Sequence, residues 1–226
     1  MRMRSKGRSP AKRPVFVFDF GGVVIKWNNN NPIYDHIAER YGIPRAEMRR
    51  VFELALPRLE TGDVSTREFL EEVLGKFGKR LRKGDSSDAL WTLPFERLVK
   101  FRVGMVELVG SLRRTGYRVY LFSNTSLPHV RLLRRKGWDR LFDGFLSSCE
   151  LRSMKPSAKA FGRALAEIGA NPSDVVFIDD KEKNVKGAKD FGIRWAFRFT
   201  SLSRLKRDLA KAISAASTAR ESARES

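Results

Sequence analysis

The chain has 226 residues, of which 42% are hydrophobic, so it can bury one sizeable core and is not disordered throughout. Its formal net charge of +19 at pH 7 suggests attraction to polyanions or phosphorylated ligands. The single cysteine excludes an internal disulfide and fits a reducing compartment. Because no apolar run reaches membrane-spanning length, we expect a cytoplasmic protein without membrane contact.

Residues 1–14 carry several lysines and arginines and no acidic residue, which predicts a disordered basic arm. Such an arm could contact nucleic acid or an anionic surface, although we favour a role in solubility. Residues 15–24, VFVFDFGGVV, follow directly. Their apolar run predicts a buried strand of a parallel sheet, with Asp19 at its carboxyl end, where ligand sites of open α/β sheets lie. A turn-capping aspartate is the alternative for this stretch alone.

Residues 28–100 contain successive helical patterns and no strand-like run. The predicted helices are residues 32–40, 45–56, 65–81 and 88–100. Ser65 and Glu68 form a capping box at the start of the third. A connection of Trp27 and four asparagines precedes the first. We therefore expect an all-helical insertion over residues 28–100.

Helices and strands alternate in the remainder of the chain. The predicted helices are residues 103–114, 127–136, 157–168, 184–190 and a last one from about residue 203, and the predicted strands are residues 117–122, 142–146, 175–178 and 195–199. Repeated β-α units predict an α/β fold with a Rossmann-like parallel sheet flanked by helices. Residues 15–27 and 101–213 would form this core, and residues 214–226 a frayed, low-complexity tail.

Three further groups of polar residues follow predicted strands. Ser123 and Asn124 can hydrogen-bond phosphate oxygens, and Lys155 could neutralise both a phosphate and Asp19. Asp179 and Asp180 are adjacent carboxylates whose repulsion needs a cation or hydrogen bonds, and magnesium prefers such oxygen ligands. Taken singly, turn chemistry or helix capping explains each group equally simply.

The segments FDFGGVV, LFSNTS, MKPSAKAF and FIDDKEKNVKGAKDFG occur in this order. Together they resemble the four motifs of the haloacid dehalogenase superfamily, over about residues 15–199. Within that superfamily the chain is similar to small sugar-phosphate phosphatases, such as α-D-glucose-1-phosphate phosphatases, and to the phosphatase domain of soluble epoxide hydrolase. The resemblance implies that the helical insertion is a cap that closes over the substrate.

The resemblance implies a magnesium-dependent phosphatase acting on a small phosphorylated metabolite, such as a sugar phosphate. Asp19 would attack phosphorus and form an aspartyl-phosphate that water hydrolyses. The implied magnesium ligands are Asp19, the Gly21 carbonyl and Asp180, with Asp179 and Asn184 supporting them. The implied phosphate-binding residues are Ser123, Asn124 and Lys155, the last also catalytic.

One position departs from the pattern of the superfamily. Most of its phosphatases carry a second aspartate two residues after the nucleophile as general acid and base, and this sequence has Gly21 there. The carbonyl ligand is retained, because any residue supplies it, but the proton carrier is lost. General acid–base catalysis is worth about 10²- to 10⁴-fold, so we expect slow turnover of esters with poor leaving groups unless a cap residue or water substitutes. The similar sugar-phosphate phosphatases also have glycine here.

Two alternatives remain. A haloacid dehalogenase shares the nucleophile, Ser-Asn and lysine but needs no metal, so the Asp179–Asp180 pair favours a phosphatase. A catalytically weak protein of this fold could instead bind nucleic acid or another acidic partner through its basic surface, for example the arginines among residues 131–135. Such a cluster is usually a solvated helix face, and we do not favour this interpretation.

Overall fold

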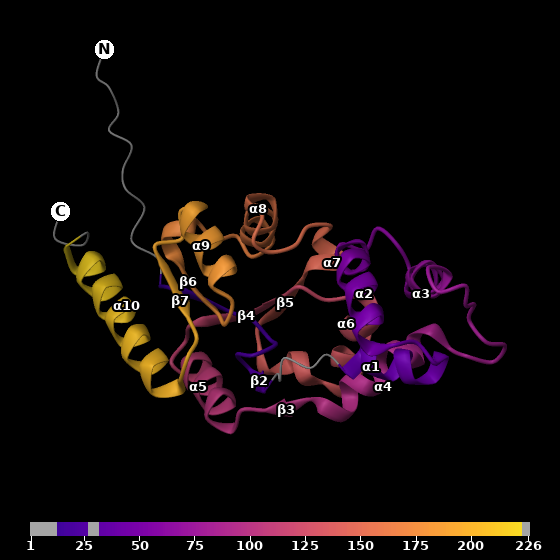
Figure 1. Ribbon diagram of the computed structural model, residues 1–226. Coiled ribbons are helices and arrows are strands. Elements are labelled where there is room, and N and C mark those ends of the chain that lie inside the picture. The colour runs from indigo at the N-terminus through magenta and orange to yellow at the C-terminus, as the bar shows by residue number, and fades with distance from the viewer. Residues whose placement is uncertain (1–12, 27–31, 223–226) are drawn as a thin grey trace, which may run out of the picture.

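The computed structural model describes residues 13–26 and 32–222 (Figure 1). A five-stranded sheet in the order β5-β4-β1-β6-β7 forms the centre, and each neighbouring pair is parallel. Its strands are β1 (Val15–Phe18), β4 (Arg118–Ser123), β5 (Gly144–Ser147), β6 (Val175–Asp179) and β7 (Trp195–Arg198). The predicted α/β class with a parallel sheet flanked by helices is therefore confirmed.

Both faces of the sheet are covered, as the unbroken apolar sequence of β1 requires. Side chains alternate along the strand, so Phe16 and Phe18 enter one buried cluster while Val15 and Val17 enter the other. The helices that contribute to the first cluster include α5 (Val103–Arg114), α6 (Leu127–Lys136) and α10 (Leu202–Ser222). Those of the second are α8 (Ala158–Glu167) and α9 (Glu182–Asp190). Short helical turns complete the described core: η1 (Trp138–Leu141), α7 (Ser148–Leu151) and η2 (Pro172–Asp174).

A second group of helices extends from one side of the sheet (Figure 1). It comprises α1 (Pro32–Tyr41), α2 (Arg45–Glu60), α3 (Thr66–Gly75) and α4 (Ser87–Leu98), which we call the helical lobe. The antiparallel pair of β2 (Ile25–Lys26) and β3 (Lys100–Phe101) joins both ends of the lobe to the core. Described residues 32–99 contain only helices and turns, in agreement with the expected helical character of this segment.

The helical lobe has its own aromatic core. The ring of Phe52 on α2 stacks on Trp91 of α4 at 5.3 Å and meets Phe69 of α3 edge-on at 5.0 Å. Ser65 begins α3 as predicted: its hydroxyl accepts from the Glu68 amide at 3.2 Å, and its own amide donates to the Glu68 carboxylate at 2.7 Å. Local capping and buried aromatic contacts thus both stabilise this helical arrangement.

Three helix boundaries differ from the prediction by four residues or more. Helix α2 continues to Glu60 rather than ending at residue 56. Helix α3 ends at Gly75 rather than at residue 81, and Gly78 turns the chain with a φ of +65° that glycine adopts readily. Helix α10 continues through Ser222, where the sequence suggested a frayed tail from residue 214. Leu205 and Leu209 anchor its first part in the core, and the alanine-rich continuation has high helix propensity.

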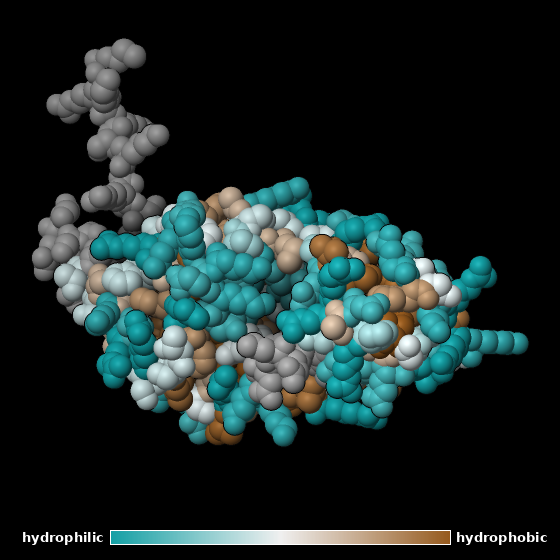
Figure 2. Space-filling model, viewed as in Figure 1, coloured by the Kyte–Doolittle hydropathy of each residue, from teal (hydrophilic) through white to brown (hydrophobic). Residues whose placement is uncertain are grey.

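Residues 1–12, 27–31 and 223–226 lie outside the described residues, and with them most of the basic arm, Trp27 and the asparagine run. The proposed division into a core, a cap and two terminal segments stays a prediction. None of the described helices is both long and apolar enough to cross a bilayer. The face of the molecule shown in Figure 2 is mostly hydrophilic.

We expect Phe52→Ala to lower the free energy of unfolding by about 3–5 kcal/mol, because it removes a fully buried ring and leaves a cavity among three aromatic neighbours. Chemical denaturation followed by circular dichroism measures this change. Leu54→Ala on the same helix is the control, since that side chain is 80% exposed and should change stability little. Equal effects of the two substitutions would contradict the packing role of Phe52.

Candidate active site

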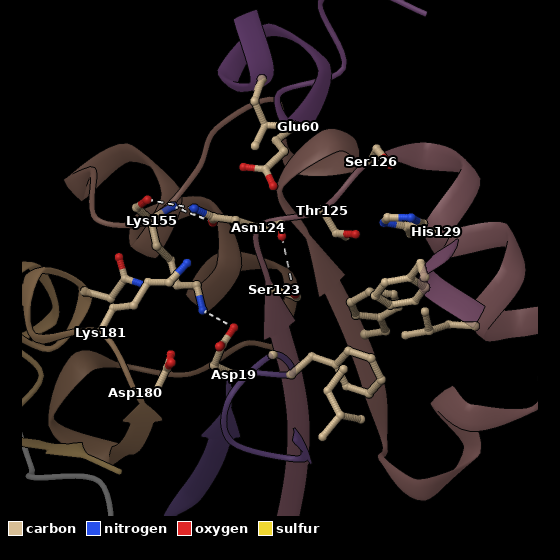
Figure 3. A pocket seen from close by; sticks show the side chains of 18 of the residues that line it. Asp19, Glu60, Ser123, Asn124, Thr125, Ser126, His129, Lys155, Asp180 and Lys181 are labelled. Atoms are coloured by element: carbon tan, nitrogen blue, oxygen red, sulfur yellow. Dashed lines mark hydrogen bonds and ion pairs between the residues drawn. The ribbon is translucent and has the colours of Figure 1, made fainter. Parts of the chain in front are cut away.

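The carboxyl ends of three neighbouring strands meet at one edge of the sheet. Phe18 at the end of β1 pairs with Leu121 of β4 and Ile178 of β6, so the residues that follow these three positions converge. A cavity of about 190 Å³ lies at this edge, and the helical lobe contributes part of its wall (Figure 3). The lining includes Asp19, Gly21, Ser123, Asn124, Lys155, Asp180 and Asn184. Asp179 lies beside them but does not line the cavity, because it is fully buried.

The ammonium group of Lys155 lies between two carboxylates. Its Nζ donates to Asp19 Oδ1 at 2.8 Å, to Asp179 Oδ2 at 2.7 Å and to the Phe122 carbonyl at 2.7 Å. These contacts use all three ammonium hydrogens. Burial alone lowers the pKa of Lys155, but Asp19 and Asp179 together outweigh it and raise that pKa above the usual value for lysine. In this arrangement the ammonium group of Lys155 binds the two carboxylates. It could bind a phosphate oxygen only if it gave up one of its three hydrogen bonds.

Both oxygens of Asp179 already have donors. Oδ1 accepts from the Lys181 amide at 2.9 Å, and the Asn184 side-chain nitrogen lies 3.0 Å from each oxygen. With Lys155 on Oδ2, the buried charge is well compensated. Asp179 therefore suits the supporting role that the resemblance implies better than a direct ligand role.

Asp180, unlike Asp179, has unsatisfied acceptor capacity. Among the described residues nothing donates to its buried Oδ1, and the buried Asn184 Oδ1 likewise has no partner. Carboxylate oxygens of Asp19, Asp179 and Asp180 lie within 4.8 Å of one another. Burial, followed by repulsion from Asp179, raises the pKa of Asp180. A divalent cation would relieve both the repulsion and the orphaned oxygen, so the residues present fit a magnesium ion.

Asn124 lines the cavity, but much of its amide is already engaged. Its Nδ2 donates to the Lys155 carbonyl at 2.8 Å, and its Oδ1 accepts from the Lys155 amide at 2.9 Å. One hydrogen of Nδ2 is left for a phosphate oxygen. Ser123 makes only a long contact, 3.4 Å, to the Asn124 carbonyl, so its hydroxyl can turn toward a ligand. Asn124 thus fixes the loop that carries Lys155, a role that the sequence did not indicate.

The sequence prediction missed five polar side chains that line the cavity: Glu60, Thr125, Ser126, His129 and Lys181. Glu60 is the last residue of α2, and its carboxyl group points into the cavity from the helical lobe (Figure 3). His129 is buried, stacks on Phe95 at 4.0 Å and places Nε2 3.3 Å from the Trp91 carbonyl. No sequence pattern distinguished Glu60 from other glutamates of the helical insertion. His129 forms part of the wall.

Gly22 controls the position of the Asp180 carboxylate. Its φ is +81°, and a Cβ atom added there would collide with Asp180 Oδ2. We expect Gly22→Ala to displace Asp180 and weaken magnesium binding about tenfold or more, as measured by titration calorimetry. Gly169→Ala is the matched control: its φ of +57° imposes similar backbone strain, but nothing lies within 4 Å. Equal magnesium affinity in both variants would exclude this role of Gly22.

The burial of His129 should make stability depend on pH. Burial lowers its pKa from 6.5 to about 4, while its hydrogen bond to the Trp91 carbonyl opposes the shift. The unfolded chain then binds the proton more readily, so this contribution is present above pH 6.5 and decreases as the pH falls toward 4. Between pH 7 and pH 5 we expect wild type to lose about 2 kcal/mol more unfolding free energy than His129→Gln. Parallel pH profiles in denaturant titrations would contradict this expectation.

Comparisons with known proteins agree with this geometry. A model of the haloacid dehalogenase-like hydrolases matches residues 14–192. A sesquiterpene phosphatase from Aspergillus oryzae is 25% identical over 179 residues, covering 78% of this chain and 85% of that protein. D-ribitol-5-phosphate phosphatase from Bacteroides thetaiotaomicron is 27% identical over 187 residues, covering 78% and 87%.

Solved structures share the fold. The magnesium complex of a haloacid dehalogenase family enzyme from Bacteroides thetaiotaomicron superposes with a TM-score of 0.69 at 24% identity, covering 86% of this chain and 98% of that one. For L-2-haloacid dehalogenase from Xanthobacter autotrophicus the TM-score is 0.59 at 21% identity, covering 88% and 83%. Because the family model spans most of the chain and ends beyond the last carboxylates of the site, the chain belongs to the haloacid dehalogenase-like hydrolase family.

Proposed function

We propose that this protein is a magnesium-dependent phosphatase that hydrolyses a small phosphomonoester through an aspartyl-phosphate on Asp19. The observation that carries the proposal is the state of the Asp19 carboxylate at the floor of the cavity. Lys155 bonds its Oδ1, whereas no described residue donates to its Oδ2. A carboxylate oxygen held this way, beside carboxylates that fit a cation, is suited to attack phosphorus.

Magnesium would be held by Asp19, the Gly21 carbonyl and Asp180, with Asp179 and Asn184 orienting the cluster. When bound, the ion would offset the charges of the phosphate and the carboxylate so that the two anions can approach. The orphaned Asp180 oxygen supports this assignment, and so does the magnesium complex of a structural relative.

The protein's own residues would divide the remaining work. Asp19 forms the bond to phosphorus while the ester oxygen departs, and water later releases phosphate and restores the carboxylate. Burial, followed by repulsion from Asp179, raises the pKa of Asp19 to about 7; the charge of Lys155 opposes this rise, and its hydrogen bond orients the carboxyl group. Ser123 and the remaining Asn124 hydrogen bind the transferring oxygens, as Ser and Asn side chains can. The helical lobe limits the access of water to this reaction.

The side chains that line the cavity beyond the phosphate site indicate which organic groups a substrate could carry. Apolar side chains form part of this lining: Phe20, Ile25, Ile33, Leu56, Trp91, Phe95, Leu133 and Phe145. The polar side chains Glu60, Thr125, Ser126, His129 and Lys181 line the cavity as well. A sugar phosphate, the substrate suggested by the resemblance, could hydrogen-bond the polar part, while an ester with an apolar group would bury that group against the apolar part. Relatives act on both kinds of compound, as the names sesquiterpene phosphatase and D-ribitol-5-phosphate phosphatase state. A screen should therefore include both kinds of ester.

The basic surface supports a nucleic-acid function less well. Arg134 pairs with Glu150 at 2.8 Å, and Arg131 lies 3.9 Å from Asp88. Arginines already facing carboxylates are less available to phosphates of a nucleic acid. The dehalogenase alternative would not need the adjacent carboxylates Asp179 and Asp180.

We expect Asp19→Asn to lower kcat for magnesium-dependent phosphomonoester hydrolysis by more than about 10³-fold, because the amide cannot act as the nucleophile. Phosphate release is measured with magnesium and with EDTA, and EDTA should abolish the wild-type activity. Asp190→Asn is the control, since that exposed residue pairs only with Lys186 among its described neighbours. Equal activity of Asp19→Asn and wild type would refute the assignment, and metal-independent halide release from 2-haloacids would favour the dehalogenase.

A further inference from the structure

The proposed reaction needs a proton carrier that the position of Gly21 does not supply. The departing ester oxygen must gain a proton, and the water that attacks the aspartyl-phosphate must lose one. Asp19 is the nucleophile, and Asp180 belongs to the cation cluster. His129 is neutral and faces the Trp91 carbonyl from within the wall, and burial keeps its pKa near 4, too low for a proton donor at neutral pH. Of the described carboxylates and imidazoles that line the cavity, Glu60 is the one left without a role.

Glu60 lies where a leaving group would depart. Figure 3 shows Asp19 and Asp180 on one side of the cavity and the Glu60 carboxyl group on the opposite side, extending from the end of α2. Phosphoryl transfer places the attacking and leaving oxygens roughly in line across phosphorus. An ester attacked by Asp19 would therefore direct its leaving oxygen toward Glu60.

The main chain at Glu60 is fixed to the sheet domain. Its carbonyl oxygen accepts a 2.6 Å hydrogen bond from the hydroxyl of Ser148, a fully buried residue at the start of α7. Two residues later Gly62, with a φ of +72°, packs so closely that an added Cβ would lie 2.8 Å from the Cys149 carbonyl. Contacts between α2 and α7 therefore hold this carboxylate of the helical lobe in place over the site.

The surroundings of Glu60 allow both protonation states. No described residue donates a hydrogen bond to its carboxylate. Lys181 and Lys183 at the start of α9, together with Lys155, face it as cations, and Asp19 and Asp180 lie across the cavity. Burial raises the pKa of Glu60 to about 7 against the opposing influence of these lysines. A carboxyl group of this kind can donate a proton and accept one near neutral pH.

We propose that Glu60 is the general acid and base of the reaction, replacing the aspartate that is absent at position 21. This inference rests on the proposed phosphatase function. In the first step the bond from Asp19 to phosphorus forms, the bond to the ester oxygen breaks, and that oxygen takes the proton of Glu60. In the second step the Glu60 carboxylate takes a proton from water as the water oxygen attacks phosphorus, releasing Asp19 and inorganic phosphate and restoring protonated Glu60.

The test compares two leaving groups in Glu60→Gln. For a primary alkyl phosphate, whose alkoxide needs a proton, we expect kcat/KM to fall about 10²- to 10⁴-fold. For p-nitrophenyl phosphate, whose phenolate leaves without one, kcat/KM should fall less than about tenfold. The ratio kcat/KM covers only the steps through loss of the alcohol, so it does not report the second step. With the base of that step missing, hydrolysis of the aspartyl-phosphate should be slow, and an initial burst of p-nitrophenolate should precede a slow steady state.

A pH profile gives a second readout. Wild-type kcat/KM for the alkyl phosphate should decline above about pH 7, as Glu60 loses its proton, and Glu60→Gln should lack this decline. Glu53→Gln is the matched control, because it makes the same change on α2 at an exposed residue that pairs with Arg49. Thermal unfolding confirms that each variant is folded.

Equal loss for both esters, or no loss for either, would overturn the role of Glu60. These results are distinct from failure of the proposed function itself. In that case wild type would not hydrolyse p-nitrophenyl phosphate with magnesium, or Asp19→Asn would be as active as wild type.

Discussion

The site depends on one buried ammonium group held between two carboxylates. Lys155 is 1% exposed, and isolating its charge from water would be costly without compensation. Asp19, Asp179 and the Phe122 carbonyl supply that compensation from the ends of three adjacent strands. Removing Lys155 would leave two buried carboxylates facing each other without a cation, so the positions of the three strand ends and the state of Asp19 are coupled.

The same network separates the two neighbouring aspartates into different roles. Both oxygens of Asp179 accept hydrogen bonds, from Lys155, from Asn184 and from a backbone amide. Its carboxylate is therefore engaged within the protein rather than exposed to the cavity. Asp180 keeps an unpartnered oxygen at the cavity. Two identical side chains at consecutive positions therefore differ in environment: donors enclose the first, and the second keeps an acceptor for the cation that we propose.

The helical lobe and the sheet edge both contribute side chains to the cavity. The sheet edge brings together Asp19, the neighbouring carboxylates and the Ser123 hydroxyl, and position 21 carries a glycine where a proton carrier could stand. The lobe adds Glu60 and much of the apolar wall.

The amino-acid sequence by itself determined the parallel α/β sheet, the helical insertion and the convergence of Asp19, Ser123, Asp179 and Asp180. These follow from local apolar patterns and from the rule that parallel strands end at a common edge. Only the tertiary structure showed that Asn124 holds the Lys155 loop and that Glu60 enters the cavity. The physical reason is that both depend on contacts between segments far apart in the chain, such as Glu60 with Ser148, and no local pattern encodes such distances.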